Sequence, residues 1–261
     1  MTIAGTVPKP LPDAVAGSVG VVLAAHGSQR RPAANAMICA HAERMRKTGP
    51  FSQVSAAFLM GDGGISDLAA ADMAADTVLI VPFMMSDGFL AGELSAQISH
   101  ALNEDGAGRR IIVTAPVGTH EDVSEIAREA AARALAKAGH AATASTLVLV
   151  AHGSKGRGES KACAEAHADR LRAQGAFQGG FQAVELAMLE EPPFMQDVLA
   201  RIDGPAAVVG LFAAPGGHAV DDVQAAIAAR ADAQIIDAGP VGQDPRMAEI
   251  AVLRALQSLE N

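Results

Sequence analysis

The sequence has few aromatic residues and few cysteines. Phe, Trp and Tyr make up 3% of its 261 residues, and Trp and Tyr do not occur. Because 50% of the chain is hydrophobic, we expect a core built from Ala, Val, Leu, Ile and Met. The two cysteines, Cys39 and Cys163, are too few for a disulfide framework and form no CxxC metal motif. We interpret both as small buried hydrophobic residues rather than metal ligands.

Long apolar segments and excess basic charge are also missing. The longest apolar run, residues 78–85, is far shorter than the about 20 residues that cross a bilayer. Residues 1–17 contain three Pro, one Lys and no apolar segment, unlike a signal peptide. A net charge of −9 disfavours non-specific binding of nucleic acid. We therefore expect a cytoplasmic protein, a monomer or homodimer, that binds neither nucleic acid nor membrane.

Glycine-rich motifs for nucleotide cofactors are absent. The sequence has no GxxxxGK[ST] motif, and GxGxxG spacing does not follow either His-Gly-Ser segment. Use of ATP or NAD is therefore not indicated, and we expect no organic cofactor.

The sequence does contain an internal repeat. An apolar segment ends in His-Gly-Ser twice, with His26 and His152 126 residues apart. Three further pairs of segments match in the same order: 56–68 with 186–199, 81–89 with 210–218, and 115–127 with 239–251. Such ordered matches indicate duplication of a structural unit. We predict an N-terminal half at 1–141 and a C-terminal half at 142–261, linked near 135–147.

Each half has the pattern of a parallel α/β fold. We expect strands near 19–25, 53–60, 77–84 and 110–114, and near 146–152, 181–189, 206–212 and 234–237. We expect helices of the first half near 32–48, 64–75, 90–104 and 121–138. Apolar runs alternating with Ala-rich helical segments indicate parallel sheets covered by helices. The prediction is an α/β fold of two tandem halves, each a four-stranded parallel sheet flanked by helices, with an active cleft between the halves.

Three ionisable residues of the second half follow predicted strands. His152 ends the first strand, Glu190 the second, and His218 follows the third. Ligands of open α/β folds bind at the carboxyl ends of the strands, so we expect these side chains to lie at one edge of the sheet. Neutral imidazoles suit divalent iron, cobalt, nickel and zinc, and a carboxylate beside them can bind metal or accept protons.

The first half keeps His26 but has Met60 in place of Glu190 and Phe89 in place of His218. We therefore predict a complete site in the second half and a degenerate one in the first, which supplies an apolar wall. His26 either binds substrate or completes the metal site as a third imidazole. His41 and His167 also match each other, but their place on the first helices indicates a structural role.

The AHGS strand ends, the LEEPP segment and the APGGH segment resemble the class II chelatases of tetrapyrrole synthesis. More narrowly they resemble the CbiX-type sirohydrochlorin cobalto- and ferrochelatases in their two-half long form, over roughly residues 19–261. The resemblance implies a lyase that inserts a divalent metal into a tetrapyrrole without ATP. It carries the paired metal-binding histidines onto His152 and His218 and the catalytic acidic residue onto Glu190. Many long-form members have the complete set in the N-terminal half, and here it is C-terminal.

Basic residues near the two His-Gly-Ser motifs are candidates for binding the substrate, and the choice of metal can be considered from the same sequence. Sirohydrochlorin carries many carboxylates, which the basic residues after the two His-Gly-Ser motifs can bind. These substrate-binding candidates are Arg30, Arg31, Lys155 and Arg157. Imidazole suits both Fe²⁺ and Co²⁺, but the sequence lacks the His-rich tail and the Cys-rich cluster of some cobalt-inserting relatives. We therefore favour ferrous insertion giving sirohaem over cobalt insertion giving cobalt-sirohydrochlorin.

Two other classes of protein fit the same residues. A metal-dependent hydrolase would use the His-Glu-His set with a further carboxylate or histidine, which the sequence does not indicate. A non-catalytic metal carrier or sensor would bind metal tightly and retain it in the purified protein.

Overall fold

The computed structural model describes residues 18–51, 53–62, 64–65, 73–104, 106, 108–153, 158–174, 180–215, 218–230 and 233–260, without the side chains of Gln174, His218 and Ala219. These residues form two compact units. The first contains the described residues up to His120 together with those from Pro245 onward, and the second is Glu121–Asp244.

The first unit is built on a parallel sheet with the strand order β2-β1-β3-β4. Its strands are β1 (Val19–Gly27), β2 (Gln53–Met60), β3 (Thr77–Pro82) and β4 (Arg110–Val113). Its helices are α2 (Pro32–Thr48), α4 (Phe89–Asn103), the short 3₁₀ turn η1 (Val117–Thr119) and α9 (Arg246–Gln257). Pro32 opens α2, a position where its missing N–H costs no intrahelical hydrogen bond.

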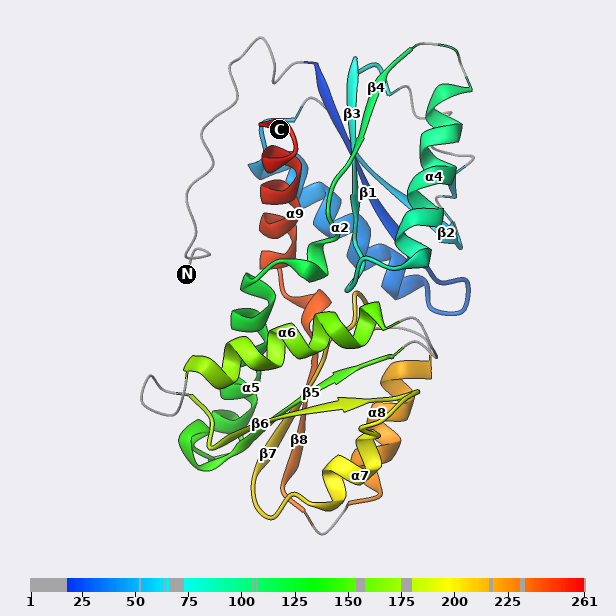
Figure 1. Ribbon diagram of the computed structural model, residues 1–261. Coiled ribbons are helices and arrows are strands. Elements are labelled where there is room, and N and C mark those ends of the chain that lie inside the picture. The colour runs from blue at the N-terminus through cyan, green and yellow to red at the C-terminus, as the bar shows by residue number, and fades with distance from the viewer. Residues whose placement is uncertain are drawn as a thin grey trace. The chain divides into compact units, whose positions relative to one another are not determined.

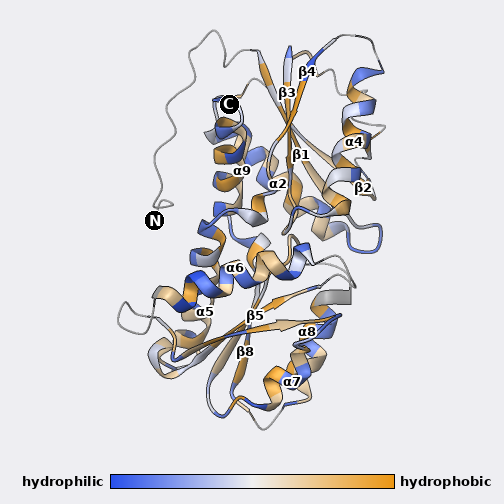
Figure 2. Ribbon diagram, viewed as in Figure 1, coloured by the Kyte–Doolittle hydropathy of each residue, from blue (hydrophilic) through white to orange (hydrophobic). Residues whose placement is uncertain are grey.

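Helices cover both faces of this sheet. Figure 1 shows α2 and α9 beside each other against one face and α4 against the other. Val22 and Leu23 of β1 are both fully buried although successive strand residues point to opposite faces. Burial on both faces explains why the central strands are continuous apolar runs, which Figure 2 shows as hydrophobic bands inside each unit.

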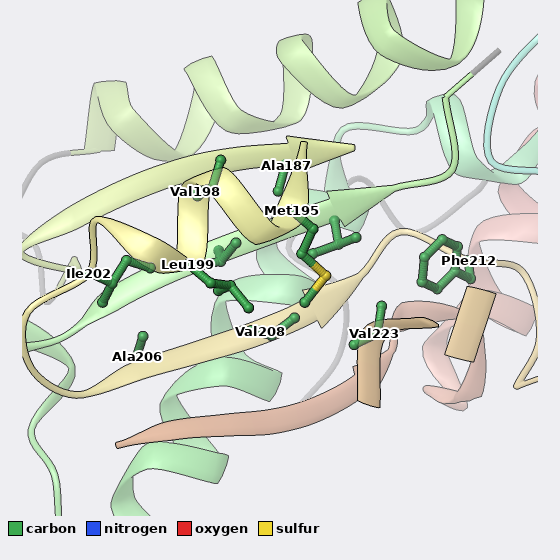
Figure 3. Packing of buried hydrophobic residues seen from close by; sticks show 11 residues of the cluster. Ala187, Met195, Val198, Leu199, Ile202, Ala206, Val208, Phe212 and Val223 are labelled. Carbon is green, nitrogen blue, oxygen red and sulfur yellow. The ribbon is translucent and has the colours of Figure 1, made fainter. Parts of the chain in front are cut away.

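The second unit repeats the design with the strand order β6-β5-β7-β8, again parallel. Its strands are β5 (Thr146–Ala151), β6 (Ala183–Met188), β7 (Ala206–Gly210) and β8 (Ile235–Pro240). Its helices are α5 (Asp122–Lys137), α6 (Glu159–Gln174), α7 (Met195–Ala200) and α8 (His218–Ala228), with 3₁₀ turns η2 (Ala142–Ala144) and η4 (Val241–Gln243). Figure 3 shows the core under α7 and α8, where Met195, Leu199 and Val208 pack together. The predicted fold class is thus confirmed.

The last helix of each sequence half packs in the unit formed by the other half. Helix α5 follows β4 in the chain but packs on α6, β7 and β8, whereas α9 packs on α2 and β3. The compact units therefore do not coincide with halves divided at residue 141, and the predicted linker at 135–147 overlaps the end of α5. An amphipathic helix must bury its apolar face, but its sequence does not state which sheet it will cover.

Polar contacts within each unit fix these exchanged helices. Arg254 Nη2 of α9 donates to Thr119 Oγ1 in η1 at 2.8 Å. In the second unit, Ser124 Oγ of α5 and His167 Nδ1 of α6 are 2.8 Å apart, and both residues are buried. His41 is also buried and stacks on Phe83, with 5.0 Å between ring centroids. The structural role predicted for His41 and His167 agrees with their burial.

Ile250→Ala is expected to destabilise the first unit, although Ile250 belongs to the second sequence half. Ile250 is fully buried on α9, so its truncation should lower the free energy of unfolding by about 2–5 kcal/mol. Urea denaturation measures the loss, and hydrogen exchange should rise in α2 and β3 more than in α6. Leu253→Ala, on the same helix but half-buried, is the control with the smaller expected loss. Faster hydrogen exchange confined to the second unit would contradict the packing of α9 in the first unit.

Among the helices in the described part of the chain, none combines the length and the apolar character needed to cross a membrane.

Candidate active site

Each sheet has a topological switch point at its first strand. In sequence order the chain leaves β1 for β2 on one side and then places β3 on the other side, and β5, β6 and β7 repeat this arrangement. A crevice for ligands forms where such connections diverge at the carboxyl ends of parallel strands. His26 lies near the end of β1, and His152 directly follows β5. Both histidines therefore occupy the position at which an open α/β sheet binds ligands.

His152 and Glu190 come together at the carboxyl end of the second sheet. The Nδ1 atom of His152 lies 3.7 Å from Oε1 of Glu190, an ion-pair distance when the imidazole is protonated. Their side chains are 52% and 43% exposed. The backbone fixes the pair, because Glu190 N donates to His152 O at 3.0 Å. An imidazole and a carboxylate that lie this close and remain accessible can form an ion pair or bind a cation from outside.

The third predicted residue, His218, is placed through the backbone. It is the first residue of α8, which follows β7, and β7 is the neighbour of β5 on the side opposite β6. Three adjacent strands thus lead to Glu190, His152 and His218. The side chain of His218 lies outside the described residues. Among the side chains that the structure does describe, no group of three His, Cys, Asp or Glu residues is arranged to hold a metal ion.

The equivalent edge of the first sheet is apolar. The β1–β2 register pairs Gly27 with Met60, and Phe89 is the first residue of α4, as His218 is of α8. Met60 is 41% exposed and Phe89 59% exposed. His26 is also exposed, and its Nδ1 lies 3.0 Å from the carbonyl oxygen of Gly27. The first unit therefore presents one imidazole and two large apolar side chains where the second presents ionisable residues.

Both His-Gly turns require glycine. Gly153 has a φ of +84°, and a Cβ on it would lie 3.0 Å from Oε1 of Glu191. Gly27 has a φ of +72°, and its Cβ would lie 2.2 Å from the carbonyl oxygen of Met60. A left-handed backbone in such close contact excludes other residues. The turns therefore hold each histidine against the end of the neighbouring strand.

Sequence reasoning missed two residues that support these turns. Asn35 accepts a hydrogen bond from Ser28 N at 2.8 Å, and its Nδ2 donates to Met60 O at 3.4 Å. In the second unit, Lys161 Nζ donates to Pro192 O at 3.0 Å. Asn35 and Lys161 each stand nine residues after the histidine of their half. The repeat register already contained this signal, because it aligns the two positions.

The structure describes half of the predicted basic residues. Arg30 is exposed, while Arg31 is half-buried and its backbone N–H donates to Ser28 Oγ at 3.1 Å. Lys155 and Arg157 lie outside the described residues. Carboxylate binding by these four residues stays a prediction.

A cavity of about 800 Å³ lies in the first unit between α2 and β2. Ser28, Asn35, Cys39, Phe58 and Asp62 are among the residues that line it. Its lining does not include the exposed residues at the end of the same sheet that were predicted to bind substrate. The cavity nevertheless adjoins the carboxyl ends of β1 and β2, because its lining includes Ser28 and Gly61, the residues that follow these strands.

Fold and site together define a tandem α/β protein with a candidate ligand site at the switch point of its parallel sheets. The chain belongs to the CbiX family, whose family model matches it twice, over residues 20–134 and 146–258. The two matches agree with the duplication deduced from the sequence. The family resemblance is thereby confirmed.

One relative with a known name is similar over most of its length. It is the "Probable sirohydrochlorin cobaltochelatase" of Halobacterium salinarum, 26% identical over 223 residues, which are 78% of this chain and 74% of the relative.

Solved structures with low sequence identity share the fold. DR2241 from Deinococcus radiodurans, described as similar to chelatases with two additional novel domains, has a TM-score of 0.73 at 24% identity. The match covers 92% of this chain but 55% of that longer one. CbiX, described as the terminal enzyme of siroheme biosynthesis in denitrifying bacteria, has a TM-score of 0.70 at 24% identity, covering 93% of this chain and 98% of its own.

Proposed function

We propose that the protein is a sirohydrochlorin chelatase, which inserts a divalent metal into sirohydrochlorin without an organic cofactor. The observation that carries the proposal is the exposed His152–Glu190 pair, 3.7 Å apart at the switch point of its sheet, with His218 opening the helix after the adjacent strand. Membership of the CbiX family and the chelatase name of the Halobacterium relative support the same substrate.

The proposed chemistry uses the three residues in two tasks. Two pyrrole N–H protons must leave as the metal enters the ring. The Glu190 carboxylate accepts them one at a time and passes each to solvent, to which its side chain is 43% exposed. His152 and His218 replace water on the metal before transfer. Two imidazoles form an incomplete ligand set, which releases a metal more readily than a closed tetrahedral site does.

In this proposal the two units have different roles. The first unit binds the macrocycle through its exposed apolar side chains, Met60 and Phe89, while His26 contacts the substrate. Arg30, Arg31, Lys155 and Arg157 bind the substrate carboxylates. The second unit carries the catalytic residues.

We further propose that Fe²⁺ is preferred over Co²⁺. Ligand chemistry does not separate these ions, because imidazole binds both. The siroheme pathway named for the CbiX structure supports iron, whereas the name of the Halobacterium relative supports cobalt.

Anaerobic incubation with sirohydrochlorin and either metal tests both proposals. We expect the absorbance spectrum to change to that of the metallated ring with each metal, faster with Fe²⁺ when the two compete at equal concentration. A faster reaction with Co²⁺ would overturn the iron preference and leave the chelatase proposal in place. No insertion above the rate without protein, for either metal, would overturn the chelatase proposal. Stoichiometric retention of metal in that case would favour the carrier.

A further inference from the structure

A second group of reactive side chains lies where α5 and α6 pack together. The Sγ atom of Cys163 lies 3.7 Å from Nε2 of His167, one helical turn further along α6. The other ring nitrogen of His167, Nδ1, lies 2.8 Å from Oγ of Ser124 on α5. The three side chains therefore form a chain of contacts from sulfur through imidazole to hydroxyl.

Burial differs along this chain of contacts. Ser124 and His167 are 1% and 2% exposed, so the imidazole is held in one orientation by its surroundings. Cys163 is half-buried and is the most exposed of the three residues. A nucleophile within reach of a base that a third group orients is the arrangement that activates thiols and hydroxyls in enzymes.

The geometry provides an acceptor for the thiol proton, because Nε2 is the ring nitrogen of His167 that faces Sγ of Cys163. The proton then moves from Sγ to Nε2 as the sulfur attacks. The bond between Ser124 and His167 keeps the ring directed at the sulfur during this transfer.

The group is specific to the second half. The repeat places Met37 at the position of Cys163, and His41, the equivalent of His167, stacks on Phe83 instead. The chain's other thiol, Cys39, has the repeat equivalent Glu165 and is thus not a copy of Cys163. Duplication of a structural helix therefore does not account for the thiol–imidazole pair.

We propose that Cys163 is a modification site whose thiol, activated by His167, reacts with hydrogen peroxide and other small electrophiles. With peroxide, the sulfur attacks one oxygen and the O–O bond breaks. The thiol proton reaches the leaving hydroxide through His167, so that a sulfenic acid and one water are formed. The sulfur is oxidised, and the peroxide is reduced.

Cys39 provides a matched control in the same chain. The prediction that both cysteines are buried is wrong, because Cys39 is exposed and Cys163 is half-buried. Partial burial of the Cys39 thiol still raises its pKa, an effect that a backbone hydrogen bond partly offsets. If access to solvent alone decided reactivity, Cys39 would react faster. If the imidazole activates Cys163, Cys163 reacts faster despite its lower exposure. Because the raised pKa also slows Cys39, substitution of Ser124 is needed to assign the difference to the imidazole.

The test is alkylation of the full-length protein with iodoacetamide at pH 7, with the rate at each thiol followed by mass spectrometry. We expect Cys163 to react about tenfold faster than Cys39 in the folded protein, and within about twofold of it in urea, where folding no longer holds the imidazole at the sulfur. With hydrogen peroxide and a sulfenic-acid trap, the trapped adduct should form first on Cys163. A Cys39 rate equal to or above that of Cys163 in the folded protein would overturn the proposal.

Ser124→Ala separates activation from exposure. The variant removes the hydroxyl that orients His167 but changes no atom of α6, so the Cys163 rate should fall at least about threefold while the Cys39 rate stays constant. Ser124→Thr, which keeps the hydroxyl, should restore the rate. An unchanged Cys163 rate in a folded Ser124→Ala protein would show that the contact does not activate the thiol. Because the comparison of the two wild-type thiols needs no substitution, the proposal remains testable if a variant fails to fold.

Discussion

His152→Ala is expected to lower kcat/KM for metal insertion by about 10²–10³-fold, the largest effect of any substitution considered. In the proposed mechanism the substitution removes a metal ligand, and it removes the imidazole that lies 3.7 Å from Glu190. The side chain is 52% exposed, so its loss should leave the fold intact. Initial rates at limiting Fe²⁺ with sirohydrochlorin measure the effect, and circular dichroism confirms folding. His218→Ala should give a loss of similar size.

His26→Ala is the matched control, because His26 stands at the equivalent strand end of the first sheet. Met60 and Phe89 stand there at the positions of Glu190 and His218, so we expect His26 to contribute to substrate binding and its substitution to raise KM by less than about tenfold. If His26→Ala is the more damaging of the two substitutions, the first unit is catalytic and the proposed division of roles is wrong.

Glu190→Gln is expected to lower kcat by about 10–100-fold with KM changed by less than about twofold. The substitution keeps the shape of the side chain but removes its capacity to accept a proton, so the loss appears in the reaction step rather than in binding. Steady-state kinetics with varied sirohydrochlorin at saturating metal separate the two constants.

Glu191→Gln provides the control for charge. Glu191 is the next residue, and its carboxyl group lies beside Gly153 in the His-Gly turn. Its substitution removes the same charge from the same turn and should change kcat by less than about threefold. A raised KM with unchanged kcat in Glu190→Gln would make Glu190 a binding residue, and equal losses in both variants would point to net charge alone.

Much of the fold could be predicted because its signals are local. The ends of strands β1, β2, β3 and β5 were predicted to within two residues. Both ends of α2 were predicted at the residues where the structure has them. Strands that are buried on both faces appear in the sequence as continuous apolar runs, and the amphipathic helices between them appear as apolar residues at helical spacing. The repeat in the sequence also aligned Met60 with Glu190 and Phe89 with His218. In the structure, strand register and the first residues of α4 and α8 place each pair at equivalent positions.

The supporting residues of the site were harder to predict. Lys161 reaches Pro192, and Asn35 reaches Met60, through side chains that cross from a helix to a turn. The repeat register aligns the two positions, yet the residues differ in type and length. Because Asn35 and Lys161 differ in chemical type, comparison of the two halves does not reveal that both support the turn.

The sequence alone determined that the chain is duplicated, that each copy forms a parallel sheet, and that ionisable residues end adjacent strands in the second copy. The predicted cleft between the halves stays a prediction. The tertiary structure decided which sheet each final helix covers, with α5 and α9 exchanged between the units. It also decided the contacts of His152 with Glu190 and of Ser124 with His167, which are 43 residues apart. Hydrophobic periodicity indicates that a helix or strand buries one face. The element against which that face packs depends on contacts among segments that are distant in the chain.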